Sequence, residues 1–544
     1  MTWPTINDTQ LGEYNAMELP GQQLAAANAK TPLEYLMNLD IKGAAGCQRL
    51  TGIMASMGNS TYDLEVMEKM MAAGMNIALL NMAFGPREEH IETIKMLKEA
   101  KRNHSMAVGK NYPLSIAIRL SGRKIRTGKI SETYGKTVEI KTGDALKLTI
   151  DETYKDRCSA QTVYVDFMYL PEQLKKDDMV LLDNETIEIQ VEMVAPTTII
   201  CLVTRGGILG SYKDVFAPNV VIKMPNYSEK DTLDIEMAVE NHVDIIILSF
   251  VNKAASITEL RTLLGDKGKN IAIMANIQTL EGFRNFDNIL EVSDGILLSR
   301  QELGSDITPK KLVIAQKNLI ARANQANVPV CICAQLLSSM ARNQISLRSE
   351  ILDIANCILD GADCLALGYE TAVGLYPVET VACMSSACKE AEACIWTHRV
   401  FSDIVEMTPL PCDQSSAIAM AGVLASQRCI AAAIIVTSTS GKTAQIVSKY
   451  RPRCPIITLT RYPAVAKKLH LYRGIIPLVF EETPNANWAL DLEKRVNFGV
   501  KFAIERGFMR VGDPVIIICS WRQGSGFTNT VKVVYVAADS TVHV

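Results

Sequence analysis

Eight short apolar runs recur between residues 52 and 368 of this 544-residue chain. Each run is followed by a polar residue or glycine and then by a segment with a helical repeat of apolar positions. Runs that are apolar at consecutive positions are typical of strands buried on both faces. The runs are 52–57, 76–81, 115–120, 244–250, 271–276, 295–300, 329–334 and 364–368. Eight such strands predict a closed parallel (β/α)8 barrel, which is a TIM barrel of the α/β class.

The regular spacing of these runs breaks once. About 120 residues separate the third run from the fourth, far more than one connecting helix uses. This segment alternates apolar and polar residues in stretches such as TVEIKTG, LKLTI and TIEIQVEMV, with turn residues between them. The pattern predicts an all-β domain inserted at residues 122–222. Because this domain leaves the carboxyl end of a barrel strand, we expect it to cover the barrel mouth as a lid.

Two further units flank the barrel, which itself is assigned to residues 48–121 and 223–394. Residues 395–544 begin with helical patterns and continue with the apolar strands AAIIV, IITLT, IIPLV, PVIIIC and VKVVYV. This order predicts an open-sheet α/β domain. Residues 1–47 are polar and rich in alanine, and they predict an arm with some helix.

Charge and cysteine usage exclude several classes of protein. The 56 Lys and Arg residues nearly cancel the 59 Asp and Glu residues, and a net charge of -3 offers no general attraction for nucleic acid or an acidic membrane. The 14 cysteines lie in apolar runs without a CxxC motif, and only six histidines are present, which is typical of reduced thiols and disfavours zinc. No secretion signal or membrane-spanning run is apparent. We expect a cytoplasmic protein without nucleic-acid or membrane partners.

The carboxyl ends of the barrel strands, where such barrels carry their active sites, hold few groups able to do chemistry. The polar residues expected there are Asn81, Arg119, Ser249, Asn276, Gln278, Arg300, Glu302, Gln335 and Glu370. Glu302 and Glu370 are the carboxylates of this set, which contains no Lys or His. A divalent ion usually needs one or two carboxylates, and acid–base catalysis needs a titrating group. This mouth is predicted to tolerate anions but to lack bases.

A phosphate site is better formed in the C-terminal domain. The strand AAIIV ends in residues 437–443, TSTSGKT, which open the helix AQIVSKY. Backbone amides at a helix start, beside hydroxyl groups and a lysine, bind phosphate. The nucleotide P-loop pattern fails, because its first glycine would fall at Val436. A plain Ser/Thr cap followed by a turn is the alternative interpretation.

Later residues can complete this phosphate site. Trp488 and Arg495 lie on a predicted helix, and residues 521–528 read WRQGSGFT. They add guanidinium groups and a glycine-containing loop. Together with residues 437–443 they are suited to a bisphosphorylated ligand.

Long motifs in register resemble the pyruvate kinase family. They are NIALLNMAFG, IRTG, SDGILLSRQELG, ANCILDGADCLALGYETAVGLYP, KYRPRCPIITLTR, LYRGI and SWRQGSGFTNT. The resemblance begins near residue 48 and reaches the carboxyl end. It implies a barrel A domain, a lid-like B domain, a C domain with a sugar-bisphosphate effector site, and a tetramer. It also implies Mg²⁺, usually K⁺, and phosphoenolpyruvate and ADP as substrates in glycolysis.

Carried over residue by residue, the resemblance places altered residues at most catalytic positions. The family's catalytic lysine, in a motif usually similar to SKIEN, falls at Asn276, and the metal-binding glutamate of that motif is Gln278. The metal-binding aspartate corresponds to Glu302. Leu79 stands at the position of the substrate-binding arginine, and Ala83 and Phe84 replace the serine and the histidine that follow it. Ala334 replaces the threonine on the proton path to the enolate. The positions retained are Asn81, Arg126, Arg300 and Glu370.

The potassium site that the family implies is altered too. Its aspartate and threonine correspond to Arg119 and Leu120, and its serine to Ala83. Some potassium-independent relatives carry a lysine at the position of Lys124, so a tethered cation is an alternative to the free ion. We expect no K⁺ site, and Mg²⁺ has Glu302 as a weakened ligand.

The effector site that the family implies is retained. Its fructose-bisphosphate positions correspond to Ser438, Ser440, Gly441, Lys442, Thr443, Trp488, Arg495, Gly524, Ser525 and Gly526. Lys442 stands where the family frequently has an arginine.

These substitutions point to impaired catalysis. Loss of one such cation or donor typically lowers the rate by about 10² to 10³, and groups that act as a unit fail together, so a combined loss on the order of 10⁴ or more is expected. The leading hypothesis is a pyruvate kinase paralogue with weakened substrate binding that serves as a regulatory or structural subunit, in a homotetramer or with an active paralogue. The alternative is an active pyruvate kinase in which Glu302 and Glu370 hold Mg²⁺ in an altered way. A different activity is less favoured, because Asn276 and Gln278 leave no base.

Overall fold

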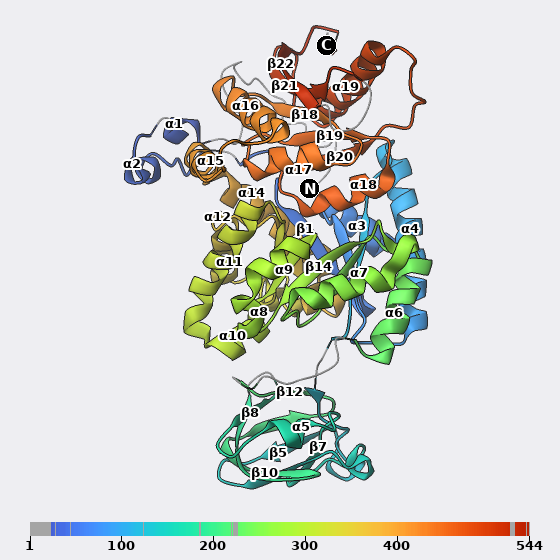
Figure 1. The fold of residues 1–544 in the computed structure, drawn as a ribbon, viewed down its shortest axis with the longest axis vertical. Helices are drawn as coiled ribbons and strands as arrows, with labels where there is room; N and C mark the ends of the chain where they lie inside the picture. The colour runs from blue at the N-terminus through green and yellow to red at the C-terminus, as the bar shows by residue number, and fades with distance from the viewer. Residues whose placement is uncertain are drawn as a thin grey trace.

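Three bodies follow one another along the long axis of the molecule (Figure 1). The C-terminal α/β part lies at one end, the barrel in the middle and the inserted β part at the other end. The computed structural model describes residues 23–27, 29–43, 45–122, 125–183, 186–218, 220, 227–522, 528–539 and 541–542.

The eight apolar runs form a closed barrel. Its strands are neighbours in the order β1-β17-β16-β15-β14-β13-β3-β2 and all pair in parallel. They are β1 (Gly52–Ser56), β2 (Ile77–Asn81), β3 (Ser115–Arg119), β13 (Ile245–Leu248), β14 (Ala272–Ile277), β15 (Gly295–Ser299), β16 (Val330–Cys333) and β17 (Cys364–Leu367). Nearly every strand residue is buried, because side chains fill the barrel on one face and meet helices on the other. The predicted α/β barrel is therefore confirmed.

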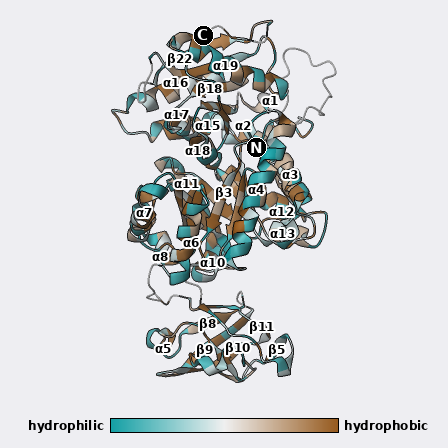
Figure 2. Ribbon diagram, turned by 90° about the vertical axis from the view of Figure 1, so that its right-hand side faces the viewer, coloured by the Kyte–Doolittle hydropathy of each residue, from teal (hydrophilic) through white to brown (hydrophobic). Residues whose placement is uncertain are grey.

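Helices that alternate with the strands wrap the outside of the barrel. They are α3 (Leu64–Ala73), α4 (Arg87–Val108), α6 (Glu229–Glu240), α7 (Ala254–Gly268), α9 (Phe286–Val292), α11 (Leu312–Ala326), α12 (Arg348–Leu359) and α14 (Pro377–Ala393). Figure 2 shows hydrophobic residues gathered on the barrel strands and hydrophilic residues on the outer helices. Short helices, among them α8 (Leu280–Arg284), α10 (Arg300–Ile307) and α13 (Tyr369–Ala372), follow strands at the carboxyl end of the barrel.

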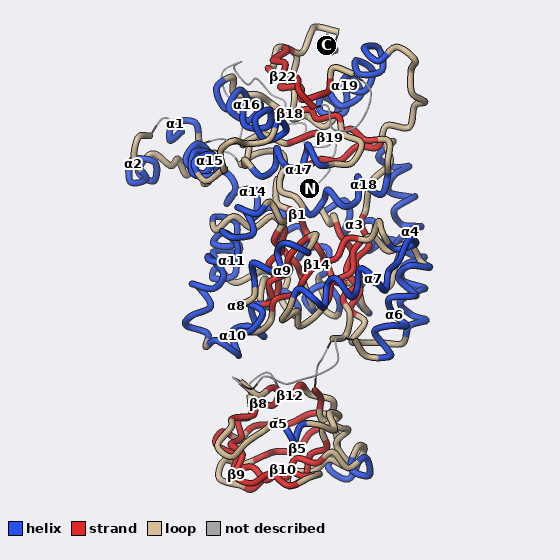
Figure 3. The backbone as a smooth tube through the Cα atoms, in the orientation of Figure 1, coloured by secondary structure: helices blue, strands red, loops and turns tan. Residues whose placement is uncertain are grey.

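The segment between β3 and β13 forms the predicted all-β structure. A seven-stranded sheet has the order β4-β12-β8-β9-β10-β6-β7, and β11 pairs with β5. The strands are β4 (Ile125–Arg126), β5 (Thr137–Ile140), β6 (Ala145–Thr149), β7 (Thr162–Tyr164), β8 (Met179–Leu182), β9 (Ile187–Ala195), β10 (Thr198–Arg205), β11 (Gly207–Gly210) and β12 (Asp214–Phe216). Figure 3 shows these strands curled around a common interior, which is a hydrophobic core separate from that of the barrel.

The C-terminal part is an open sheet with helices on its faces. The strand order is β20-β19-β18-β21-β22, and β22 is antiparallel to its neighbour. The strands are β18 (Ala433–Thr437), β19 (Ile456–Thr460), β20 (Ile475–Val479), β21 (Pro514–Ser520) and β22 (Thr528–Tyr535). The helices are α15 (Thr397–Glu406), α16 (Gln414–Arg428), α17 (Lys442–Lys449), α18 (Pro463–Lys468) and α19 (Trp488–Glu505).

Polar contacts attach this C-terminal part to the amino ends of the barrel strands. Asp244, just before β13, forms an ion pair with Lys467 at 2.9 Å. Asp363, just before β17, forms one with Arg451 at 2.6 Å. The Ser115 hydroxyl donates to the Lys467 carbonyl at 2.6 Å. The C-terminal part therefore covers the end of the barrel opposite the mouth.

The described part of the amino-terminal arm contains α1 (Leu24–Ala27) and α2 (Pro32–Met37). Ala26, Ala29 and Tyr35 form a small buried cluster against Trp396. Among the described residues, no helix combines the length and the apolar character needed to cross a membrane. The domain boundaries at residues 47/48, 121/122, 222/223 and 394/395 stay a prediction.

Candidate functional site

The barrel brings the predicted mouth residues to the carboxyl ends of its strands. They are Asn81 at the end of β2, Arg119 at the end of β3, Ser249 just after β13, Asn276 in β14, Gln278 just after it, Arg300 and Glu302 at the start of α10, Gln335 after β16 and Glu370 in α13. Because parallel strands share one carboxyl edge, these residues surround a single mouth.

Arg119 and Glu302 form an ion pair across this mouth. Arg119 Nη2 lies 3.4 Å from Glu302 Oε1, and both side chains are mostly buried. Arg119 Nε also donates to the Ser249 hydroxyl at 3.4 Å, and that hydroxyl donates to the Leu120 carbonyl at 2.9 Å. The Glu302 carboxylate therefore already has a cationic partner within the chain.

The two carboxamides at the end of β14, Asn276 within it and Gln278 just after it, are completely buried. Gln278 Oε1 accepts the Phe250 N–H at 2.8 Å, whereas Gln278 Nε2 has no hydrogen-bond partner among the described residues. Neither side-chain polar atom of Asn276 has a partner there. Carboxamides do not titrate near neutral pH, so neither residue can serve as a general base.

Leu79 and Ala334 put apolar groups at two further positions of the mouth. Leu79 belongs to the apolar cluster inside the barrel, together with Cys331 and Ala366. Ala334 has a positive φ of 78°. Its carbonyl accepts hydrogen bonds from Arg300 Nη2 at 2.9 Å and Nε at 3.3 Å.

Arg300 is held by groups of the protein. Its Nη1 and Nη2 contact the two carboxylate oxygens of Asp353 at 2.8 and 2.6 Å. Burial alone lowers the pKa of Arg300, but the Asp353 carboxylate outweighs it and the pKa lies above its ordinary value. Asp353 was not among the predicted site residues, because it lies on α12 and not at a strand end.

Glu370 is buried and accepts two hydrogen bonds. Its Oε2 accepts the Gly368 N–H at 2.7 Å, and its Oε1 accepts the Ser338 hydroxyl at 3.2 Å. Burial raises the pKa of this carboxyl above its ordinary value. Asn81 accepts the Ala83 N–H at 3.2 Å and thereby shapes its own loop.

Arg126 connects the inserted β part to the mouth. It lies on β4, with its guanidinium 5.5 Å from the centre of the Phe84 ring. Its Nη1 donates to the Ala83 carbonyl at 3.4 Å, and its Nε lies 3.6 Å from Asp214. Lys124, the predicted tethered cation, lies outside the described residues.

The carboxylates at the described part of the mouth are held by other groups of the chain. Within the described ranges, no group of three or more His, Cys, Asp or Glu side chains is placed to share a metal ion. Glu302 is paired with Arg119, and Glu370 is held by Gly368 and Ser338. Gln278 supplies a neutral oxygen that is already engaged by a backbone N–H.

The predicted phosphate cradle lies between β18 and α17. Gly441 begins the helix with a φ of 83°, and an added Cβ would lie 3.0 Å from Val465 and 3.1 Å from Leu469. The Ser438 hydroxyl accepts the Gly441 N–H at 2.9 Å, and the Ser440 hydroxyl accepts the Lys442 N–H at 3.4 Å. These two hydroxyls cap the amides of this turn.

Trp488 and Arg495 converge on the same strand pair as the cradle. Thr443 shares a hydrogen bond of 3.0 Å with Thr528, and Trp488 Nε1 donates to the Ser520 carbonyl at 3.2 Å. Ser520 and Thr528 are partners in the β21–β22 ladder. The Arg495 guanidinium lies 4.9 Å from the Trp488 ring centre. Gly524, Ser525 and Gly526 lie outside the described residues.

The Asp491 carboxylate holds Arg495 in place. Asp491 lies 3.1 Å from Arg495 and also forms an ion pair of 2.7 Å with Arg461. Burial lowers the pKa of Arg495, and the Asp491 carboxylate raises it in part. Sequence reasoning missed Asp491, although its position one helical turn before Arg495 is a recognisable signal.

Comparison with known proteins confirms the resemblance found in the sequence. The family model "Pyruvate kinase, barrel domain" matches residues 48–381, and "Pyruvate kinase, alpha/beta domain" matches residues 416–534. The chain is 40% identical to Pyruvate kinase PKLR of Rattus norvegicus over 95% of this chain and 90% of that protein. It is 36% identical to Pyruvate kinase 1 of Saccharomyces cerevisiae over 92% of this chain and 99% of that protein.

Proposed function

Because the chain belongs to the pyruvate kinase family, we propose that it is a member with little or no phosphoryl transfer, acting as a regulatory or structural subunit. The proposal rests on the ion pair between Arg119 and Glu302. The family's reaction converts phosphoenolpyruvate and ADP to pyruvate and ATP.

Phosphoryl transfer depends mainly on positioning and charge neutralisation. At this mouth Asn276 and Leu79 are neutral where the family has a lysine and an arginine. Arg300, which is retained, is bound bidentately by Asp353. The charges that stabilise a transferring phosphoryl group are therefore missing or already neutralised.

The mouth fits neither of the family's metal ions. A divalent ion needs hard, anionic oxygens, and the Glu302 carboxylate is compensated by Arg119. At the potassium position, Arg119 puts a cation where the family has an aspartate.

The phosphate cradle supports a binding role. Ser438, Ser440 and Thr443 surround the start of α17, and the exposed Lys442 adds a positive charge. Arg495 is held over Trp488 beside the same strand pair. A sugar bisphosphate such as fructose bisphosphate is the proposed ligand, with Gly524, Ser525 and Gly526 included by resemblance.

The proposed partners are further subunits, either copies of this chain or an active paralogue, in a cytoplasmic tetramer. On α2 the large apolar side chains Leu33, Leu36 and Met37 are 69, 62 and 76% exposed. Several exposed apolar side chains on one short helix favour a protein contact.

A coupled assay of purified protein tests the loss of activity. It uses saturating phosphoenolpyruvate, ADP, Mg²⁺ and fructose bisphosphate, and we expect turnover at or near background. Turnover within about a hundredfold of the median enzyme value, which is about 10 s⁻¹, contradicts the proposal and favours the active enzyme.

Two further measurements test the binding and subunit roles. Titration calorimetry with fructose bisphosphate is expected to show binding, and its absence in folded protein removes the effector role. Refolding the chain together with an active pyruvate kinase is expected to yield mixed oligomers, which native mass spectrometry resolves.

A further inference from the structure

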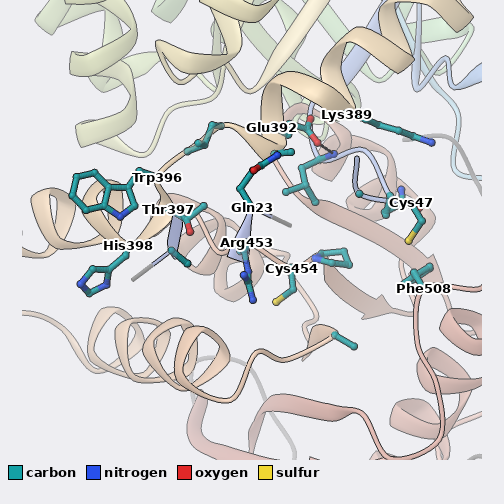
Figure 4. Close-up of a pocket in the computed structure, with 18 of the residues that line it drawn as sticks. Gln23, Cys47, Lys389, Glu392, Trp396, Thr397, His398, Arg453, Cys454 and Phe508 are labelled. Atoms are coloured by element: carbon teal, nitrogen blue, oxygen red, sulfur yellow. Dashed lines mark hydrogen bonds between the residues drawn. The ribbon is translucent and has the colours of Figure 1, made fainter. Parts of the chain in front are cut away.

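A cavity of about 130 Å³ lies where the arm, the barrel and the C-terminal part meet (Figure 4). Gln23 and Tyr35 come from the arm, Gln48 precedes β1, Trp396 follows α14, and Arg453 precedes β19. One water molecule needs roughly 10–15 Å³ by this measure, so the cavity has room for a small metabolite. None of these residues belongs to the barrel mouth or to the phosphate cradle.

The carboxylates that line the cavity are already held by backbone groups. Glu392 accepts the Leu50 N–H at 2.7 Å and the Thr51 N–H at 2.6 Å. Asp513 accepts the Arg510 N–H at 2.7 Å. These bonds connect the cavity walls to the barrel entry and to the turn before β21.

Arg453 is a partly buried cation without a carboxylate partner. Its guanidinium makes no hydrogen bond or ion pair with any residue in the described ranges. Burial lowers its pKa, while nearby Cys454 and Tyr35 raise it. Cations removed from water are normally paired, so this guanidinium is suited to an anionic ligand.

Gln48 supplies a second unpaired polar group. Its side chain is 7% exposed, and its amide oxygen accepts no hydrogen bond from the described residues. Its Nε2 donates to the Arg49 carbonyl at 3.3 Å. A ligand that donates a hydrogen bond to the Gln48 oxygen removes the cost of this unpaired group.

Aromatic rings supply the apolar surface of the cavity. Tyr35 and Trp396 are stacked, with ring centres 5.2 Å apart and an angle of 11° between their planes. Figure 4 shows Trp396 and Phe508 on either side of Arg453. A flat apolar body can pack against such rings.

We propose that this cavity binds a small organic anion with a flat apolar body and a hydrogen-bond donor. Arg453 pairs with the anionic group, and Gln48 accepts from the donor. The ligand holds the arm, the barrel and the C-terminal part in one arrangement and stabilises the folded chain. This binding site is independent of the proposed loss of catalysis.

Three matched probes test the site on the full-length protein by titration calorimetry and thermal unfolding. They are 4-hydroxybenzoate, which has charge and donor, benzoate, which has charge alone, and phenol, which has the donor alone. We expect 4-hydroxybenzoate to bind and to raise the unfolding temperature. We expect benzoate to bind about fivefold more weakly, which corresponds to one hydrogen bond of roughly 1 kcal/mol, and phenol to bind below detection.

Variants assign the binding to this cavity. Arg453→Gln is expected to weaken 4-hydroxybenzoate binding at least tenfold, and Gln48→Leu to abolish its advantage over benzoate. Lys442→Ala alters only the phosphate cradle and is expected to leave both affinities unchanged. The site is refuted if the wild-type chain binds neither anion, or if Arg453→Gln and Gln48→Leu, verified as folded by circular dichroism, bind as the wild type does.

Discussion

The guanidinium of Arg119 lies 3.4 Å from the Glu302 carboxylate, so the carboxylate that the sequence resemblance assigns to the metal is paired with a cation of the same chain. The pair is mostly buried, and the Ser249 hydroxyl supports it from the Arg119 side. An internal cation thus lies beside the carboxylate that we propose as the altered metal position. The effect of Arg119 on metal binding can be measured separately from the effects of Asn276, Gln278 and Leu79.

Removing this internal cation is expected to increase the affinity of the mouth for divalent ions. Arg119→Met keeps much of the side-chain volume but removes the Arg119 cation from the Glu302 carboxylate. A unit charge a few ångströms away contributes about 1 to 4 kcal/mol at effective dielectric constants of roughly 80 to 20, so Mn²⁺ affinity is expected to increase at least about fivefold. Electron paramagnetic resonance of free Mn²⁺ measures this change. Arg119→Lys keeps the charge and is the control, and equal Mn²⁺ affinity in both variants contradicts the prediction.

Asn276→Leu is expected to stabilise the fold. Both polar atoms of Asn276 are buried without a partner in the described structure. An unpaired buried polar group costs about 1–3 kcal/mol, so a leucine, which has the same branching but is larger, is expected to raise the free energy of unfolding by roughly 1 kcal/mol. Urea unfolding measures this value. Asn81→Leu removes a side chain that accepts the Ala83 N–H and is expected to destabilise instead. A loss of stability in Asn276→Leu contradicts the prediction.

Glu370 is expected to make stability depend on pH. Burial raises its pKa above the ordinary 4.5, although hydrogen bonds from Gly368 and Ser338 lower it in part. Since the folded chain then binds this proton more tightly than the unfolded chain, ionisation of Glu370 opposes folding. The loss of stability caused by the ionised Glu370 is fully present above the pKa that this group has in the folded chain. The loss disappears as the pH falls below that pKa.

Glu370→Gln removes this titration. The unfolding temperature of the wild type, measured relative to this variant by differential scanning calorimetry, is expected to rise as the pH falls from 7 toward 4.5. A difference that stays constant over this range contradicts a raised pKa.

Gly441→Ala is expected to damage the phosphate cradle. The backbone there has a φ of 83°, and the new Cβ would press on Val465 and Leu469. Gly109, at the end of α4, has a similar left-handed backbone with a φ of 74° but open space around it. In each variant the alanine is expected to lower the free energy of unfolding by roughly 1–2 kcal/mol, because its backbone is left-handed. Only Gly441→Ala is expected to lose affinity for fructose bisphosphate, which calorimetry measures. Equal affinity in both variants argues against the cradle.

The barrel was predictable because its strands are apolar on both faces. The runs 52–57 and 364–368 became β1 and β17, which close the barrel although they lie far apart in the sequence. The alternation within residues 122–222 identified an all-β insertion for the same reason, because the side-chain period follows directly from strand geometry.

The partners of the site residues were not predictable. Arg300 looked available to a ligand, but Asp353 on α12 binds it. Arg119 and Glu302 are 183 positions apart in the sequence, and only the barrel closure brings them together. The cavity around Arg453 has walls from the arm, the barrel and the C-terminal part, so no local pattern marks it.

The two aspartates at the amino ends of β13 and β17 restrict how this chain can be recombined with its relatives. Asp244 and Asp363 each receive a cation from the C-terminal part and a backbone N–H from a neighbouring barrel strand. A chimera that exchanges residues 395–544 for those of an active enzyme must therefore bring cations equivalent to Lys467 and Arg451. Without these cations, the buried carboxylates of Asp244 and Asp363 lose their ion pairs where the barrel meets the C-terminal part. Such a chimera is expected to assemble incorrectly before its activity can be measured.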